Sequence, residues 1–416
     1  MQTVSDVVAA AGRIESPRLI AAISRIVRDV GVAEELVQDA LLAALEQWPA
    51  SGIPDRPGAW LQAAARHRAV DYVRRRGALE AKQYQLVREY EADRERGDVE
   101  RQAIDDERLG DDLLELVFVC CHPVLPRPTR VALTLRMIGA LTTAEIASAF
   151  LVPEATVAQR IVRGKKALAG ADVRFELPAG EELDSRVPAV LEVIYLIFNE
   201  GYSASAGEAW TRPALCEDAL RLVRMVAARS EGVAEVHGLA GLLELQASRL
   251  AARLDGEGEP VLLEDQDRMR WNRLLIRRGL TALDAASRAR GAQPPGAYEL
   301  QAQIAACHAI ARDAAETDWV RIAALYAALA ARAPSPVVEL NRAVAVGRAF
   351  GPAAGLELVD AIRDEPALAT YHLLPSVRAD LLSKLGRREE AKAELLRAAE
   401  LTANQAARHL LQARLG

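Results

Sequence analysis

The stretch Leu141–Leu168, LTTAEIASAFLVPEATVAQRIVRGKKAL, is typical of two short helices joined by a tight turn. Thr142 or Thr143 is suited to cap the first helix. Pro153 suits the first turn of the second helix, where its missing N–H costs nothing. This pattern predicts a helix-turn-helix, in which one face of the second helix packs while the other enters the major groove of DNA.

The second helix of this stretch has two chemically different faces. Val157, Ile161 and Leu168 fall on one face at helical spacing. The other face carries side chains that suit base edges and phosphates. These candidate DNA-binding residues are Thr156, Gln159, Arg160, Arg163 and Lys166. The alternative explanation is a solvated amphipathic helix with a basic face.

The composition predicts an all-α protein. Of the 416 residues, 51% are hydrophobic but only 4% are aromatic, and Ala and Leu are abundant, which favours helices over sheets. No apolar run is long enough to span a membrane, and the N-terminus does not resemble a secretory signal. Of the four cysteines, Cys120 and Cys121 are adjacent and cannot easily bridge each other, and the other two are scattered, which indicates reduced thiols. We therefore expect a cytoplasmic protein with no membrane partner.

Residues 1–78 form the first predicted domain. Helices are expected at Pro17–Val30, ended by Gly31, and at Ala33–Trp48. A loop rich in Pro and Gly precedes a third helix, Trp60–Arg76. The basic side chains of this third helix are Arg66, Arg68, Arg74, Arg75 and Arg76, with His67 among them and Asp71 as the single acidic interruption. For an isolated charge run, a solvated face is the commoner explanation.

Residues 79–112 form a predicted acidic linker, and residues 113–177 contain the helix-turn-helix. Cys120, Cys121 and His122 are metal-ligand types, but no second ligand pair follows at zinc-site spacing. No nucleophile–base pair and no phosphate-binding glycine loop are present in the sequence. We therefore expect no metal, no cofactor and no enzymatic activity.

Three stretches occur in a specific order: QDALLAALEQW from Gln38, WLQAAARHRAVDYVRRR from Trp60, and RIVRGKKAL from Arg160. With the acidic linker between the last two, this order resembles an alternative sigma-70 family factor of the extracytoplasmic-function type. The resemblance implies that the first domain is region 2 and the helix-turn-helix is region 4. It also implies bacterial RNA polymerase core and promoter DNA as partners.

The resemblance implies a role for each matching position. The polymerase-binding residues, which would dock on the β′ clamp helices, are Glu35, Gln38, Asp39 and Leu42. The residues implied at the −10 element are Trp60, Arg66, His67, Arg68, Arg74 and Arg75. The loop Ser51–Gly58 matches the one that holds a flipped base, and the helix-turn-helix matches the −35 reader, beside the β flap. His67 departs from the family, which often has Asn there.

The second half of the chain is predicted to be entirely helical, in two parts, 178–290 and 291–416. Stretches such as FNEGYSAS (198–205), DRMRWNRLLI (267–276) and SPVVELNRAVAV (335–346) resemble sigma factors with a long C-terminal extension. The resemblance implies that the extension regulates the factor in place of a separate anti-sigma partner. We expect it to contact the promoter-binding domains intramolecularly.

The last hundred residues contain a weak internal repeat. One set of small and large residues recurs at the same spacings, namely Ala349, Ala354, Leu358 and Ala361 against Gly386, Ala391, Leu395 and Ala398. The distance between the sets is near the ~34-residue tetratricopeptide unit. Stacked units of this kind form a concave groove for protein or peptide ligands.

A polar stretch after the apolar helix Val187–Phe198 is a further candidate ligand site. It contains Asn199, Glu200 and Tyr202. The alternative, which we favour, is a structural turn whose polar groups are satisfied by neighbouring helices.

For the whole chain, the main hypothesis is a sigma factor with a fused regulatory extension. The alternative is a polymerase-independent helix-turn-helix regulator with a helical-repeat sensor domain. A helical-repeat scaffold or enzyme with an incidental DNA-binding appearance is a third hypothesis.

Overall fold

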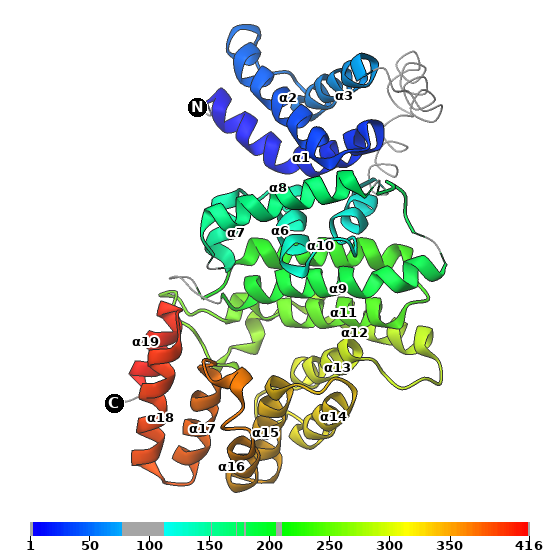
Figure 1. Ribbon diagram of the computed structural model, residues 1–416. Helices are drawn as coiled ribbons and strands as arrows, with labels where there is room; N and C mark the ends of the chain where they lie inside the picture. The colour runs from blue at the N-terminus through cyan, green and yellow to red at the C-terminus, as the bar shows by residue number, and fades with distance from the viewer. Residues whose placement is uncertain are drawn as a thin grey trace. The chain divides into compact units, whose positions relative to one another are not determined.

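The computed structural model describes residues 3–76, 112–150, 152–171, 173–178, 180–204 and 210–414 (Figure 1). In these ranges the regular elements are helices, and the only strand-like pairing is an isolated bridge between Leu254 and Pro260. The prediction of an all-α fold is confirmed there. The predicted acidic linker lies outside the described residues, except for Asp112.

The chain divides into two compact units. The first contains Met1–Ser148 and Val152–Val193, and the second contains Ala149–Leu151 and Ile194–Gly416. The boundary between them falls inside a single helix, α9 (Glu181–Tyr202).

The first unit begins with three mutually packed helices, α1 (Val4–Val27), α2 (Val30–Ser51) and α3 (Pro57–Arg76). The expected start of the first helix at Pro17 was wrong, because a capping box between Thr3 and Asp6 starts α1 at Val4. Pro17 is buried inside the helix.

The expected break at Gly31 was also wrong. The first helix ends instead at Arg28, which has a left-handed φ of 54°. Asp29 then caps α2 by accepting the N–H groups of Gly31 and Val32 at 2.7 and 3.1 Å. Gly31 therefore belongs to the first turn of α2.

The helix-turn-helix follows a buried helix over residues 112–120 and α6 (Arg127–Met137). Its two helices are α7 (Thr143–Phe150) and α8 (Glu154–Gly170). Thr142 rather than Thr143 caps α7, since its Oγ1 accepts the Glu145 N–H at 3.1 Å and Glu145 accepts the Thr142 N–H at 2.7 Å. Pro153 immediately precedes α8 as its N-cap residue.

The second unit continues from α9 with α10 (Pro213–Arg229), α11 (Ala234–Ala247), α12 (Arg273–Arg290), α13 (Ala297–Ile310) and α14 (Trp319–Arg332). Helix α11 packs on α10, α12 and α13. Gly238 permits the approach of α13, because an added Cβ would lie 2.7 Å from the backbone N of Glu299.

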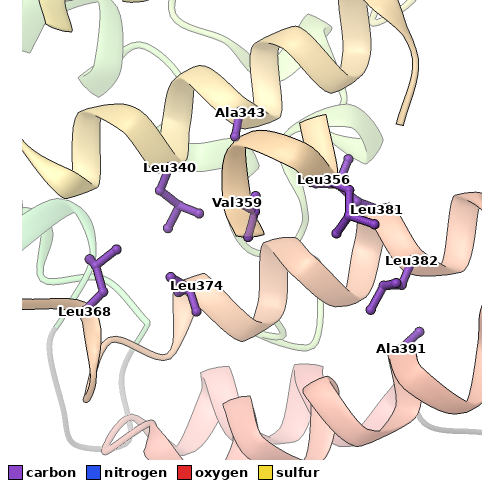
Figure 2. Packing of buried hydrophobic residues seen from close by; sticks show 9 residues of the cluster. All are labelled: Leu340, Ala343, Leu356, Val359, Leu368, Leu374, Leu381, Leu382 and Ala391. Atoms are coloured by element: carbon purple, nitrogen blue, oxygen red, sulfur yellow. The ribbon is translucent and has the colours of Figure 1, made fainter. Parts of the chain in front are cut away.

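Five further helices complete the second unit, α15 (Pro336–Phe350), α16 (Pro352–Ala361), α17 (Leu373–Lys384), α18 (Arg388–Leu401) and α19 (Gln405–Ala413), each packing on the one before it. Figure 2 shows the hydrophobic core between α15, α16 and α17, in which Val359 and Leu381 are among the buried side chains. Gly351 and Gly386, with φ of 103° and 76°, precede the second helices of the pairs α15–α16 and α17–α18.

On α16, the buried positions differ from those that the spacing of the internal repeat predicts. Val359 is fully buried on α16, whereas Ala361 is exposed and Leu358 is only half-buried. On α18, both Leu395 and Ala398 are buried, as expected. The buried position on α16 is therefore Val359, one residue after the predicted Leu358. Small residues are so frequent in this part of the chain that two alignments of the repeat, one residue apart, fit almost equally well.

Candidate nucleic-acid interface

Helix α8 separates its packed and polar faces as its periodicity predicts. Val157, Ile161, Gly164 and Leu168 are buried against the rest of the first unit. On the other side, Gln159, Arg163 and Lys166 are exposed, while Thr156 and Arg160 are half-buried. In the described part of the chain, none of the cations Arg160, Arg163 and Lys166 forms an ion pair. Helix α8 thus presents positive charge that an anionic partner can neutralise.

The second basic helix, α3, is fixed at its start by an aromatic contact. The Trp60 ring meets the Trp48 ring edge-on, with centroids 5.5 Å apart, and Trp48 is buried in α2. Along α3, His67, Arg74 and Arg75 are exposed, and Arg66 and Arg68 are half-buried. The side chain of Arg76 lies outside the described residues. The expected basic residues therefore share one helix, with its tryptophan anchored on α2.

Two polar contacts restrain the middle of α3. Asp71, the single acidic interruption, lies 3.5 Å from Nδ1 of His67. Arg68 donates through Nη1 to the carbonyl of Ala64 at 3.1 Å. Between α2 and α3, Gly52 adopts a φ of 85°, which starts the non-helical loop at the N-terminal side of α3.

Helix α2 exposes all four predicted polymerase-binding residues. Glu35, Gln38 and Asp39 are exposed, and Leu42 is 56% exposed. An exposed apolar side chain with a polar rim is a feature of protein-binding surfaces. Leu45, which the sequence analysis did not single out, is also exposed at 39% and extends this apolar strip.

A groove of about 360 Å³ adjoins this strip. It is lined by Gln38, Leu41 and Leu45 of α2, together with residues of α1 and Arg136 of α6. The groove therefore combines apolar walls with a charged end, within the first unit.

Glu34 links the two candidate DNA-binding domains, and sequence reasoning missed it. Its side chain on α2 is only 7% exposed. One carboxylate oxygen accepts from Nε of Arg136 on α6 at 2.6 Å, and the other forms an ion pair with Lys165 on α8. A second link joins Arg25 of α1 to Asp112 at 2.5 Å. No local signal distinguishes Glu34 from its exposed neighbour Glu35.

The candidate extension site resembles the structural alternative. Glu200 is buried and accepts from Arg212 at 3.0 Å. The Tyr202 ring stacks on Phe198 and lies 3.9 Å from the guanidinium carbon of Arg253. The Asn199 carbonyl accepts the N–H of Ser203, as in an ordinary helix end. The expected end of the apolar helix at Phe198 was wrong, because α9 continues to Tyr202 and these contacts pack Asn199, Glu200 and Tyr202 into its last turn.

The Cys120, Cys121 and His122 triplet, which has the residue types of metal ligands, lies in a largely buried setting. Across the described residues, no cluster of three or more His, Cys, Asp or Glu side chains is positioned to hold a metal ion. Cys120 and Cys121 are buried, and burial raises the pKa of the Cys121 thiol to about 12. Burial also lowers the pKa of His122. In the same ranges, no helix is both long and apolar enough to cross a membrane.

Comparison with known families and proteins gives three family matches. Residues 13–78 match Sigma-70 region 2, and residues 116–168 match Sigma-70, region 4. Residues 186–287 match a family of unknown function, DUF6596. The chain is also 42% identical over 388 residues to an uncharacterized protein of Rhizobium meliloti (strain 1021), covering 93% of this chain and 90% of the relative. No solved structure matches.

Proposed function

Because the chain belongs to the sigma-70 family and carries a long helical extension after region 4, we propose that it is a sigma factor of the extracytoplasmic-function type. In this role it directs bacterial RNA polymerase to specific promoters. The observation that carries the proposal is the pairing, in one unit, of a cationic recognition helix with an exposed acidic and apolar surface on α2. The cationic helix suits promoter DNA, and the acidic and apolar surface suits a protein partner.

At the −35 element, we assign recognition to α8. Arg163 and Gln159 are exposed and suited to guanine and adenine edges, and Lys166 is suited to a phosphate. Thr156 and Arg160, which are half-buried, are assigned to the edge of the same contact.

At the −10 element, we assign single-strand binding to α3 and its preceding loop. Arg74 and Arg75 supply positive charge to the backbone of a melted strand, and Trp60 supplies a stacking surface. Arg66, His67 and Arg68 complete the set. The loop Ser51–Gly58 is assigned to the flipped base.

We assign core polymerase binding to Glu35, Gln38, Asp39 and Leu42 of α2. The extension is proposed to regulate the factor through an intramolecular contact with the promoter-binding domains, and to be partly tetratricopeptide-like. The proposed domains are 1–78, 79–112, 113–177, 178–290 and 291–416. Because promoter DNA and core polymerase are cytoplasmic in bacteria, we propose that the protein acts in the cytoplasm and has no catalytic role.

Run-off transcription with core polymerase and a promoter library tests the main proposal. We expect transcripts whose start sites share −35 and −10 elements, from the full chain or from a version ending near Pro178. Activity of the shorter version alone would identify the extension as inhibitory. Tight duplex binding without core polymerase, and no transcription from either version, would favour the stand-alone regulator.

The polymerase surface has its own test. Asp39→Ala should weaken binding to core polymerase about tenfold without changing the free energy of unfolding, because Asp39 is exposed. Glu46→Ala, an exposed carboxylate on the same helix, serves as the matched control. Equal core affinity for the two variants would remove Asp39 from the proposed surface.

A further inference from the structure

A cavity of about 500 Å³ lies within the second unit, among its C-terminal helices. It is bordered by the short 3-10 helices η2 (Leu263–Asp265) and η3 (Arg268–Arg270), the end of α13, the start of α14, and by α15 and α17, and it is open to solvent on one side. This volume is within the range of small-molecule sites. Most of its wall is apolar, formed by Leu262, Leu263, Ala314, Trp319, Val344, Val377 and Leu381.

The charged side chains that line the cavity are not balanced. The cations are Arg268, Arg348, Lys384 and Arg414, whereas the anions are Glu264 and Asp380. Glu264 forms an ion pair with Arg348. Asp380 is shared between two cations, with Lys384 at 2.5 Å and Arg414 at 3.5 Å. One of these two cations is therefore only partly neutralised, and the lining carries net positive charge.

Arg268 adds a cation that is bound by neutral groups. Its guanidinium donates to the carbonyl of Ala311 at 2.9 Å, to the carbonyl of His308, and more weakly to Thr317 Oγ1. Asp313 is near enough to influence it, but the carboxylate of Asp313 accepts the N–H groups of Ala315 and Glu316. In the described part of the chain, Arg268 forms no ion pair. These contacts, with the Trp271 ring 4.8 Å from its guanidinium carbon, fix Arg268 at the cavity wall without a carboxylate in ion-pair contact.

Arg249 is close enough to His308, a lining residue, to influence it electrostatically, and Arg253 in turn influences Arg249. Arg249 donates through Nε and Nη2 to one amide oxygen of Gln246, at 3.2 and 2.9 Å. Arg253 is buried against the Tyr202 ring. Neither forms an ion pair within the described ranges. Burying a cation without a carboxylate is costly, so these arginines add to the positive potential near His308.

We propose that this cavity is a binding site for a small amphipathic molecule that carries an oxyanion, such as an aromatic carboxylate. The apolar part packs against Trp319, Val344 and Leu381, and the oxyanion lies near Lys384 and Arg268. The size of the cavity favours a small molecule over a folded protein partner. This inference concerns ligand binding and stands independently of the proposed transcriptional role.

A pair of fluorescent probes tests the proposal on the full chain. The anionic probe is 1-anilinonaphthalene-8-sulfonate, and the neutral probe is N-phenyl-1-naphthylamine, which has the same rings without the sulfonate. We expect one anionic probe to bind per chain and to be displaced by salicylate. Lys384→Ala should weaken its binding about tenfold, because a charge-assisted contact is lost.

The same substitution should leave the affinity for the neutral probe within about twofold. Lys392→Ala, an exposed lysine on α18 outside the cavity, is the matched control and should change neither affinity. Far-UV circular dichroism verifies that each variant is folded. Failure of the anionic probe to bind would overturn the proposal. The proposal would also be overturned if both probes bound with equal affinity and Lys384→Ala had no effect. The site would then be an apolar crevice without selectivity for anions.

Discussion

Nε of Arg136 on α6 lies 2.6 Å from Oε1 of Glu34 on α2, so a cation of the helix-turn-helix domain neutralises a carboxylate of the first domain. Lys165 of the recognition helix α8 neutralises the other carboxylate oxygen. The Glu34 side chain is 7% exposed, whereas the side chains of Arg136 and Lys165 are 25% and 22% exposed. Removing the carboxylate would therefore leave two partly buried cations without their partner.

Glu34→Gln should lower the free energy of unfolding of the first unit by about 1–3 kcal/mol, less than for a fully buried pair because both cations retain contact with water. Urea denaturation at neutral pH measures the change. Glu35→Gln, its exposed neighbour, should change stability by no more than about 0.5 kcal/mol. If the two variants were equally stable, the Glu34 ion pairs would make no net contribution to joining the domains.

The close approach of α6 and α8 leads to a second prediction. A Cβ added at Gly164 would lie 2.6 Å from Thr129 Cγ2 and 2.7 Å from Leu133 Cδ1, so Gly164→Ala must push the helices apart. We expect a loss of about 1–3 kcal/mol of stability.

Gly170→Ala, at the end of the same helix, meets no atom within 4 Å and should be neutral or slightly stabilising. Thermal unfolding monitored by circular dichroism compares the two variants. A Gly164→Ala protein as stable as the parent would contradict the close helix packing.

The recognition helix supplies a third prediction. Arg163→Ala should weaken binding to a preferred promoter by about 1–3 kcal/mol and relax the preference at one −35 position, if Arg163 contacts a base. Arg174→Ala, an exposed arginine beyond α8, is the control and should alter binding only slightly. Competition assays with core polymerase and single-base promoter variants measure both effects. An unchanged base preference for Arg163→Ala would assign that side chain to the solvated face instead.

The helix-turn-helix was predictable because its information is local. Val157, Ile161 and Leu168 repeat at helical spacing, and Pro153 marks where α8 begins. The start of α1 was predicted wrongly although Thr3 and Asp6 carry the capping-box pattern. The prediction took Pro17 as the helix start and overlooked the capping box between Thr3 and Asp6.

The tertiary relationships were not predictable from the pattern. Glu34 and Glu35 are neighbours in the same turn of α2. Glu34 is buried and Glu35 exposed only because Arg136 and Lys165 approach Glu34 from distant segments of the chain. The cationic cavity likewise draws Arg268, Lys384 and Arg414 from three separate segments. Contacts of this kind depend on packing, which periodicity within one helix does not encode.

The last prediction concerns pH. Burial, together with the charges of Arg249 and Arg268, lowers the pKa of His308 from 6.5 to about 4. Between these values the unfolded chain binds a proton that the folded protein does not. The free energy of unfolding therefore falls as the pH is lowered from about 7 to about 4, and His308 accounts for at most about 3 kcal/mol of that loss.

His308→Phe should remove this part of the pH dependence while keeping an aromatic ring beside Trp319, whose centroid lies 5.3 Å from that of His308. Denaturant titrations at pH 7 and pH 5 measure the difference, with the exposed His409→Phe as control. The stability lost on acidification should be smaller for His308→Phe than for the parent, and unchanged for the control. Identical losses for all three proteins would mean that His308 accepts a proton in the folded state as readily as in the unfolded chain. The charges of Arg249 and Arg268 would then be too weak to exclude a further positive charge at His308.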